Sequence, residues 1–155
     1  MRSLISVVAL ALLTACISNP NRCDTPRPTD PATETFASQL QIDLSQMTRT
    51  VNGVYYRDVV VGNGAELQVA RVVEVFYVAY LKDGSVVDQQ LSTPLQLDLQ
   101  LNAAPGIAEG MIGMQVGGRR FLVVPSALAL GACGKGPIPP NSTLIYEIEL
   151  VAITP

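Results

Sequence analysis

Two segments of the sequence have an apolar residue at every second position. Leucine occupies every second position from 95 to 101, and apolar residues occupy every second position from 144 to 150, with Glu147 and Glu149 between them. A period of two places neighbouring side chains on opposite faces of a β-strand. Each segment therefore predicts a strand with one buried face, and the chain must supply a second layer to cover that face.

Three other segments predict strands from their β-branched and aromatic content, namely 54–61, 72–81 and 119–124. Asp83-Gly84 follows the second of them and precedes a short apolar segment at 85–88, a pattern typical of a hairpin. The alternating segment at the end is expected to extend over 143–153. Such consecutive strands are expected to pair antiparallel.

One short helix is predicted between the strands. Pro105, Gly106 and Ile107 open it, because proline fits the first turn of a helix, and the pattern extends it over 106–114. Antiparallel strands with one helix between them indicate an α+β fold. We expect one such domain over 51–155, which suits a chain of 155 residues.

Residues 1–15 are typical of an export signal. Arg2 precedes an apolar run from Leu4 to Leu13, and this run is too short to span a bilayer as a helix. The following Leu13-Thr14-Ala15-Cys16 resembles the bacterial lipobox, whose cysteine is acylated after cleavage. We expect a lipid anchor at Cys16 that holds the protein on the periplasmic side of the cell envelope. A plain secretory signal with an unmodified Cys16 is the alternative.

Ile17, which follows the expected anchor, is not the aspartate that usually retains lipoproteins in the inner membrane, so the outer membrane is favoured. Residues 16–35 are rich in proline and polar side chains, which predicts an extended tether. Phe36, Leu40, Leu44 and Met47 then recur at helical spacing and predict an amphipathic arm over 36–50.

Composition excludes several classes of function. The chain has no histidine, which removes Ser-His-Asp and Cys-His catalysis and histidine metal sites, and no metal or cofactor is expected. Ten basic and 13 acidic residues without a basic cluster argue against nucleic acid as a partner. Cys23 and Cys133 are left for one disulfide in an oxidising compartment, or for two free thiols.

Longer motifs resemble the FKBP family of peptidyl-prolyl cis-trans isomerases. They are YVAYLKDGSVVD at 77–88, PLQL at 94–97, APGIAEGMIGMQVGGRR at 104–120 and VPSALALGACGKGPIPPNSTLIYEIELV at 124–151. The resemblance extends from about Gly53 to Ala152. It implies a twisted antiparallel sheet wrapped around the short helix, with an apolar pocket between the two.

The resemblance also implies the residues of the site. Tyr77 and Asp88 correspond to its polar, catalytic members. The substrate-binding wall, floor and loop side correspond to Val87, Leu95, Ala103, Ala104, Ile107, Leu130, Ile138 and Tyr146. From the residues alone, Tyr77 is more often a core tyrosine, and only the motif raises its functional role to about equal weight. Asp88 alone would ordinarily be a solvated carboxylate at a turn or strand end.

This chain departs from the family pattern at several of these positions. Val87 and Leu95 replace the usual phenylalanines, Ile107 replaces tryptophan, and Leu130 replaces tyrosine. Ala103-Ala104 stands where the family usually has Val-Ile. The loss of buried aromatic surface predicts a wider pocket that grips a proline ring less tightly.

Two functions are compatible with the sequence. One is an envelope isomerase of reduced activity that acts on proline-containing polypeptides and assists the folding of exported proteins. The other is a weakly catalytic binding module or chaperone that holds apolar or proline-containing segments. The retained Tyr77 and Asp88 favour the first, whereas the aliphatic pocket favours the second. Neither the natural substrates nor the oligomeric state follow from the residues.

Overall fold

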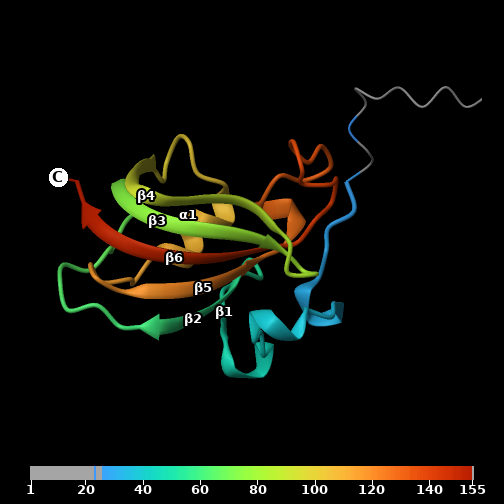
Figure 1. Ribbon diagram of the computed structural model, residues 1–155, viewed down its shortest axis with the longest axis horizontal. Coiled ribbons are helices and arrows are strands. Elements are labelled where there is room, and N and C mark those ends of the chain that lie inside the picture. The colour runs from blue at the N-terminus through green and yellow to red at the C-terminus, as the bar shows by residue number, and fades with distance from the viewer. Residues whose placement is uncertain (1–22, 24–25, 155) are drawn as a thin grey trace, which may run out of the picture.

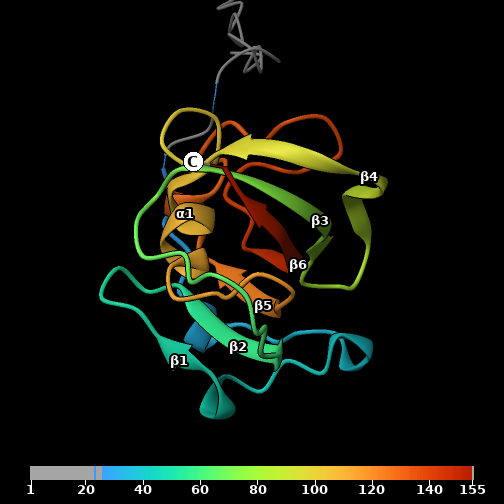
Figure 2. The same ribbon diagram turned by 90° about the vertical axis from the view of Figure 1, so that its left-hand side faces the viewer.

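The structure, a computed structural model, describes residue 23 and residues 26–154. Its centre is a six-stranded antiparallel sheet with the strand order β1-β2-β5-β6-β3-β4 (Figure 1). The strands are β1 Thr48–Arg49, β2 Tyr55–Val60, β3 Val72–Leu81, β4 Val86–Asp98, β5 Arg119–Val124 and β6 Leu144–Ile153. The helix α1, Pro105–Met111, lies on one face, and the strands form an arc beside it in Figure 2. The predicted α+β fold is confirmed.

The predicted strands are confirmed with small changes at their ends. β3 and β5 have the expected bounds, and β6 begins one residue later than expected. The two segments predicted at 85–88 and 95–101 belong to one strand, β4. Its pairing with β3 shifts between Gln90, opposite Tyr77, and Leu95, opposite Val75, so the intervening residues 91–94 lie outside the ladder.

The predicted burial of Leu101 is wrong. Its side chain is 80% exposed, whereas Leu99 is buried. β4 ends at Asp98, whose carboxylate accepts hydrogen bonds from the backbone N–H groups of Gln100 and Leu101. This turn interrupts the alternation that the sequence suggested. Helix α1 is also shorter than expected, because Ile112 is extended and Gly113 has a φ of 81°.

The inner core lies between the sheet and α1. Leu122 and Val124 of β5 point into it together with Leu144 and Ile148 of β6, and Met111 of α1 packs against them. Alternate residues of the same strands point to the other face of the sheet. The period-two pattern of β5 and β6 therefore supplies two apolar layers, each of which needs a cover.

The predicted helical arm over 36–50 is wrong. The segment forms two single 3₁₀ turns, Ser38–Leu40 and Leu44–Gln46, and then β1. Gln41 adopts a left-handed φ of 50°, and the Asp43 carboxylate accepts the N–H of Ser45 to start a new turn. The apolar residues of the arm nevertheless cover the outer face of the sheet. Leu40 packs there with Tyr55, Val123 and Ile145.

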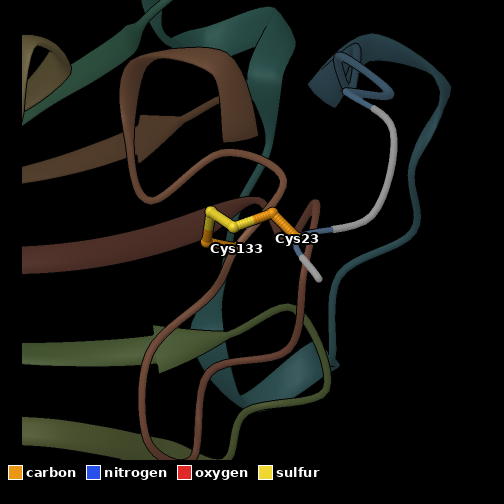
Figure 3. Close-up of a disulfide and its surroundings, with 2 residues drawn as sticks. All are labelled: Cys23 and Cys133. Atoms are coloured by element: carbon orange, nitrogen blue, oxygen red, sulfur yellow. A yellow bond between two sulfur atoms is a disulfide. The ribbon is translucent and has the colours of Figure 1, made fainter. Parts of the chain in front are cut away.

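The predicted extended tether over 16–35 is wrong within its described part. Residues 27–34 lie on the domain, where Pro31 is buried and Thr29 bonds to Ser126 and Thr143. Cys23 is joined to Cys133 by a disulfide that spans 110 residues of sequence (Figure 3). The side chains that hydrogen-bond to this segment lie about 100 residues later in the sequence. The composition of the segment therefore could not predict these bonds.

The predicted signal at 1–15 and the predicted acylation of Cys16 lie outside the described residues. Within the described part of the chain, no helix has the length and apolar character needed to cross a membrane.

Arg120 is a buried charge that links the sheet to the helix. Its side chain is 4% exposed and forms a two-pronged ion pair with Asp58, at 2.6 and 3.1 Å. The guanidinium also donates to the carbonyls of Gly110 and Ile112 and lies 4.4 Å from the ring centre of Tyr56. These contacts satisfy carbonyl groups at the C-terminal end of α1 and hold the helix on the sheet.

Candidate functional site

A mostly apolar cavity of about 240 Å³ opens between the inner face of the sheet and α1. β3, β4 and β6 supply one wall, the residues before α1 and Ile107 supply the floor, and Leu130 closes the side toward the long loop after β5. The lining residues are Val75, Tyr77, Asp88, Leu95, Leu97, Asn102, Ala103, Ala104, Ile107, Leu130, Tyr146 and Ile148.

Tyr77 and Asp88 form the polar pair of this cavity. The hydroxyl of Tyr77 donates a hydrogen bond of 2.7 Å to Oδ2 of Asp88, and Oδ1 of Asp88 accepts the backbone N–H of Gln89 at 2.9 Å. In the pairing of β3 with β4, Asp88 lies opposite Ala79. Ala79 and Tyr77 are two positions apart on β3, so their side chains share one face of the sheet, and Asp88 lies on that face next to Tyr77. Burial of the ring, then the hydrogen bond and charge of Asp88, raise the pKa of Tyr77.

Tyr146 lies deeper, on β6. Burial, followed by the charge of Asp88, raises its pKa to about 12. Both tyrosines of the cavity are therefore protonated near neutral pH and are not poised to give up a proton. A carboxylate, protonated tyrosines and aliphatic walls do not form an activated nucleophile or an acid–base relay. The arrangement can desolvate a bound group and orient it.

Most of the predicted site residues are brought together. Tyr77, Asp88 and Tyr146 meet at the cavity, and the predicted apolar residues Leu95, Ala103, Ala104, Ile107 and Leu130 line it. Val87 and Ile138 pack against the inner core and are not among the lining residues. Val87 lies at a register shift between β3 and β4, between Val86 opposite Tyr80 and Asp88 opposite Ala79, and its side chain packs against the inner core beside the cavity. Ile138 pairs with Lys135 across a tight turn of the loop.

The structure adds four lining residues that sequence analysis missed, namely Val75, Leu97, Asn102 and Ile148. Three of them lie two positions from a predicted residue on the same strand. Val75 precedes Tyr77, Leu97 follows Leu95 and Ile148 follows Tyr146, so the period of two could have found them. Asn102 lies in the turn before α1, where no periodic signal exists.

Among residue 23 and residues 26–154, no group of three or more cysteine and acidic side chains is arranged to hold a metal ion. Within the same part of the chain, no buried side-chain nitrogen or oxygen lacks a hydrogen-bond partner. Asp88 is exposed, and its carboxylate accepts hydrogen bonds from the hydroxyl of Tyr77 and from the backbone N–H of Gln89.

Comparison with known proteins agrees with the fold and the cavity. Residues 64–151 match the family model described as FKBP-type peptidyl-prolyl cis-trans isomerase. This range contains β3 to β5, most of β6 and every residue that lines the cavity. The match therefore covers the elements that build the site.

Relatives of known sequence include FkpA of Escherichia coli K12, 33% identical over 79% of this chain and 44% of that protein, and an FK506-binding protein of Neisseria meningitidis, 35% identical over 66% of this chain and 98% of that protein. An FK506-binding protein of Dictyostelium discoideum is 37% identical over 70% of this chain. The chain spans 30% of that Dictyostelium protein and 52% of a chloroplastic isomerase from Arabidopsis thaliana.

Solved structures give the same result. The crystal structure of Escherichia coli FkpA superposes with a TM-score of 0.67 at 32% identity over 76% of this chain and 55% of that chain. The isomerase structure from Pseudomonas syringae superposes with a TM-score of 0.65 at 32% identity over 71% of this chain and 82% of that chain. The fold agrees with these structures, since an antiparallel sheet surrounds one short helix with a Tyr–Asp pair at the cavity between them. The family model matches more than half of the sequence. The chain therefore belongs to the FKBP-type peptidyl-prolyl cis-trans isomerase family.

Proposed function

We propose that the protein is a peptidyl-prolyl cis-trans isomerase that acts on proline-containing segments of polypeptides, with reduced activity. The observation that carries the proposal is the cavity itself, whose walls are aliphatic except for the hydrogen-bonded Tyr77 and Asp88, Tyr146 and Asn102. Rotation about an X-Pro amide needs neither a nucleophile nor a transferred proton. A site without acid–base machinery suits this reaction.

The barrier to rotation, about 18–20 kcal/mol, comes from amide resonance that holds the bond planar. The planar amide is more polar than the twisted one, so an apolar site that excludes water favours the twisted state. Ile107 and Tyr146 would contact the proline ring, and Asp88 would lie beside the rotating amide. These side chains would position the substrate and supply no reacting atom.

The reduced activity follows from the aliphatic side chains at Leu95, Ile107 and Leu130. Two or three missing aromatic contacts of about 0.5–1.5 kcal/mol each correspond to a rate deficit of about one to three powers of ten. Restoring Ile107→Trp and Leu130→Tyr together should recover part of that deficit. Asp88→Ala should lower the rate further.

A prolyl-peptide isomerisation assay tests the proposal. It uses the oxidised full-length protein carrying Cys16→Ser, so that no lipid is attached, and a protease-free readout. The protein with its own cavity residues should isomerise the peptide faster than buffer alone does. The double variant Ile107→Trp, Leu130→Tyr should be faster still. If the folded protein gives no acceleration in either form, the binding-module alternative, which the aliphatic cavity favours, replaces the isomerase.

We also propose that the protein is anchored in the bacterial cell envelope through an acylated Cys16 and assists the folding of exported proteins there. The support is the Leu13-Thr14-Ala15-Cys16 sequence after an apolar run. The protein should partition with membranes, and Cys16→Ser should move it to the soluble fraction. Unchanged membrane partition of the Cys16→Ser protein would contradict the lipid anchor.

A further inference from the structure

The N-terminal segment 27–39, called the brace below, lies between two elements that flank the cavity. One is the loop 125–143, which carries Leu130. The other is the turn 82–85 between β3 and β4, which leads directly to Asp88. The brace bonds to both of them. In Figure 1 this N-terminal part of the chain, in blue, lies beside the loop and the end of the β3–β4 hairpin.

A chain of hydroxyl groups joins the brace to the loop. The N–H of Ser126 donates to Oγ1 of Thr29 at 2.8 Å, the hydroxyls of Thr29 and Thr143 are 2.7 Å apart, and Thr143 donates to Oε1 of Glu34 at 2.8 Å. A carboxylate only accepts, so the single proton of Thr143 goes to Glu34. The proton between the two hydroxyls is therefore that of Thr29, which donates to Thr143. Glu34 thus fixes which hydroxyl donates in each of these two hydrogen bonds.

The second carboxylate oxygen of Glu34 reaches the hairpin turn. It lies 3.4 Å from Nζ of Lys82, and the Glu34 side chain is only 11% exposed. Next to this pair, the N–H of Ala37 donates to the carbonyl of Lys82 at 2.8 Å, and the amide of Gln39 donates to the carbonyl of Asp83. One carboxylate thus connects the loop that carries Leu130 to the strand that carries Asp88.

Apolar packing does not fix the separation of the loop and the turn. A second cavity of about 240 Å³ lies where they face each other, and it is lined by Thr29, Glu34, Leu81, Lys82, Pro139 and Thr143 among others. Close-packed side chains would hold two elements at a set distance, but an open space between them cannot. The pairing of Leu144 with Leu81 at the ends of β6 and β3 joins the loop to the turn here, and the polar bridge through Glu34 adds a second connection between them.

We propose that Glu34 and Thr29 are positioning residues that set the spacing between the Leu130 loop and the Asp88 strand, and through it the residue before proline that the pocket accepts. The inference rests on the proposed isomerase function. It assigns to the N-terminal segment a role in specificity, in addition to covering the sheet. Neither residue lines the cavity that contains Tyr77 and Asp88, so both act through Thr143, Ser126 and Lys82.

The test compares substrates within one variant. In the oxidised Cys16→Ser protein, Glu34→Ala should change the ratio of kcat/KM between a Phe-Pro and an Ala-Pro peptide by about tenfold, because small displacements at a site have large effects on rate. A loss of folded protein would lower both values equally and leave the ratio unchanged. Glu34→Gln retains an oxygen that accepts from Thr143, so it should restore most of the wild-type ratio.

Asp43→Asn is the matched control. Asp43 is an acidic residue just after the brace, and its carboxylate caps the turn at Ser45 without bonding to the loop or to the hairpin. This variant should leave the ratio at its wild-type value. A shift of the ratio in Asp43→Asn equal to that in Glu34→Ala would overturn the positioning role.

Amide chemical shifts give a readout that does not depend on activity. Glu34→Ala should move the signals of Leu130 and Asp88, which have no contact with Glu34, while Asp43→Asn should leave them in place. Shifts confined to Thr29, Lys82 and Thr143 would overturn the proposal even if the protein is an isomerase. If Glu34→Ala does not fold, Thr29→Val takes its place, because this substitution removes the hydroxyl that links Ser126 to Thr143 with little change in side-chain volume. Thr29→Ser keeps a hydroxyl and should restore the wild-type ratio and shifts.

Discussion

The hydroxyl of Tyr77 has a single proton, and that proton is directed at Asp88. The charge of Asp88 is in turn shared between Tyr77 and the N–H of Gln89. A carboxylate that already accepts two hydrogen bonds can act on a neighbouring amide through its charge and is not free to take a proton as a general base. The polar pair is therefore suited to orient an amide beside it.

This arrangement predicts that catalysis is independent of pH over the neutral range. Burial raises the pKa of Tyr77 and raises that of Tyr146 to about 12, and the chain has no histidine. The acceleration of isomerisation should be flat from about pH 6 to 9 once the rate in buffer is subtracted, and a bell-shaped profile would show acid–base catalysis instead.

Burial of the tyrosines should make stability fall in alkali. A tyrosine whose folded pKa lies above the unfolded value of about 10 stabilises the fold below that pH, and the contribution is lost as pH rises through the folded value. For Tyr146 this loss falls between about pH 10 and the folded pKa of about 12. Thermal unfolding followed by circular dichroism at both ends of that range measures it, and an equal melting temperature at the two ends would contradict it.

Arg120 gives a prediction about stability at a single residue. Replacing it with alanine leaves Asp58 and the carbonyls of Gly110 and Ile112 without their donor. The free energy of unfolding should fall by about 3 kcal/mol or more, as for other broken buried ion pairs.

Arg119, its neighbour, provides the control for Arg120. It is exposed and pairs with Glu147 at 3.4 Å, so Arg119→Ala should cost less than about 1 kcal/mol. Urea unfolding of the two variants measures the contrast. Equal losses for both would show that Arg120 does not hold α1 on the sheet.

Among the elements, the disulfide between Cys23 and Cys133 links the N-terminal segment to the loop after β5. Replacing both cysteines with serine in the Cys16→Ser protein should lower the free energy of unfolding by about 2–4 kcal/mol, because the link constrains the unfolded chain. Urea unfolding against the Cys16→Ser parent measures the loss. Two free thiols in the unreduced, denatured parent would show that the bond does not form.

The strands were predictable because their signal is local. The β-branched and aromatic content of 72–81 specifies a strand, and the period of two in 144–150 specifies both the strand and the face it buries. The arm was not predictable, since Phe36, Leu40, Leu44 and Met47 have helical spacing but pack on Tyr55, Val123 and Ile145, which are distant in sequence. The shape of that partner surface, and not the spacing, decided the local structure.

The site divides in the same way. Its wall on β3, β4 and β6 follows from the family resemblance and could be completed by the period of two. The contacts of Thr29 and Glu34 with Thr143 join residues 114 and 109 positions apart, and the sequence contains no pattern that pairs them. Loops and caps depend on such non-local pairs, which explains why strands are easier to predict.

For the whole molecule, the position of β6 in the sheet is decisive. It pairs with β3 on one side and with β5 on the other, and it is the last strand in sequence order. Without it the sheet divides into β1-β2-β5 and β3-β4. A chain that stops at residue 143 should therefore show no cooperative thermal transition, and one that retains a folded core would contradict this prediction.

A chain leaves the ribosome from its N-terminus, so the strand that joins the two halves of this sheet is made last. The surfaces that the arm covers, on β5 and β6, do not exist while the arm itself is being synthesised. Until β6 emerges, the earlier strands have exposed edges and apolar faces, the condition in which chains aggregate or need a holding partner. A protein proposed to assist the folding of others would itself fold only after β6 has been made.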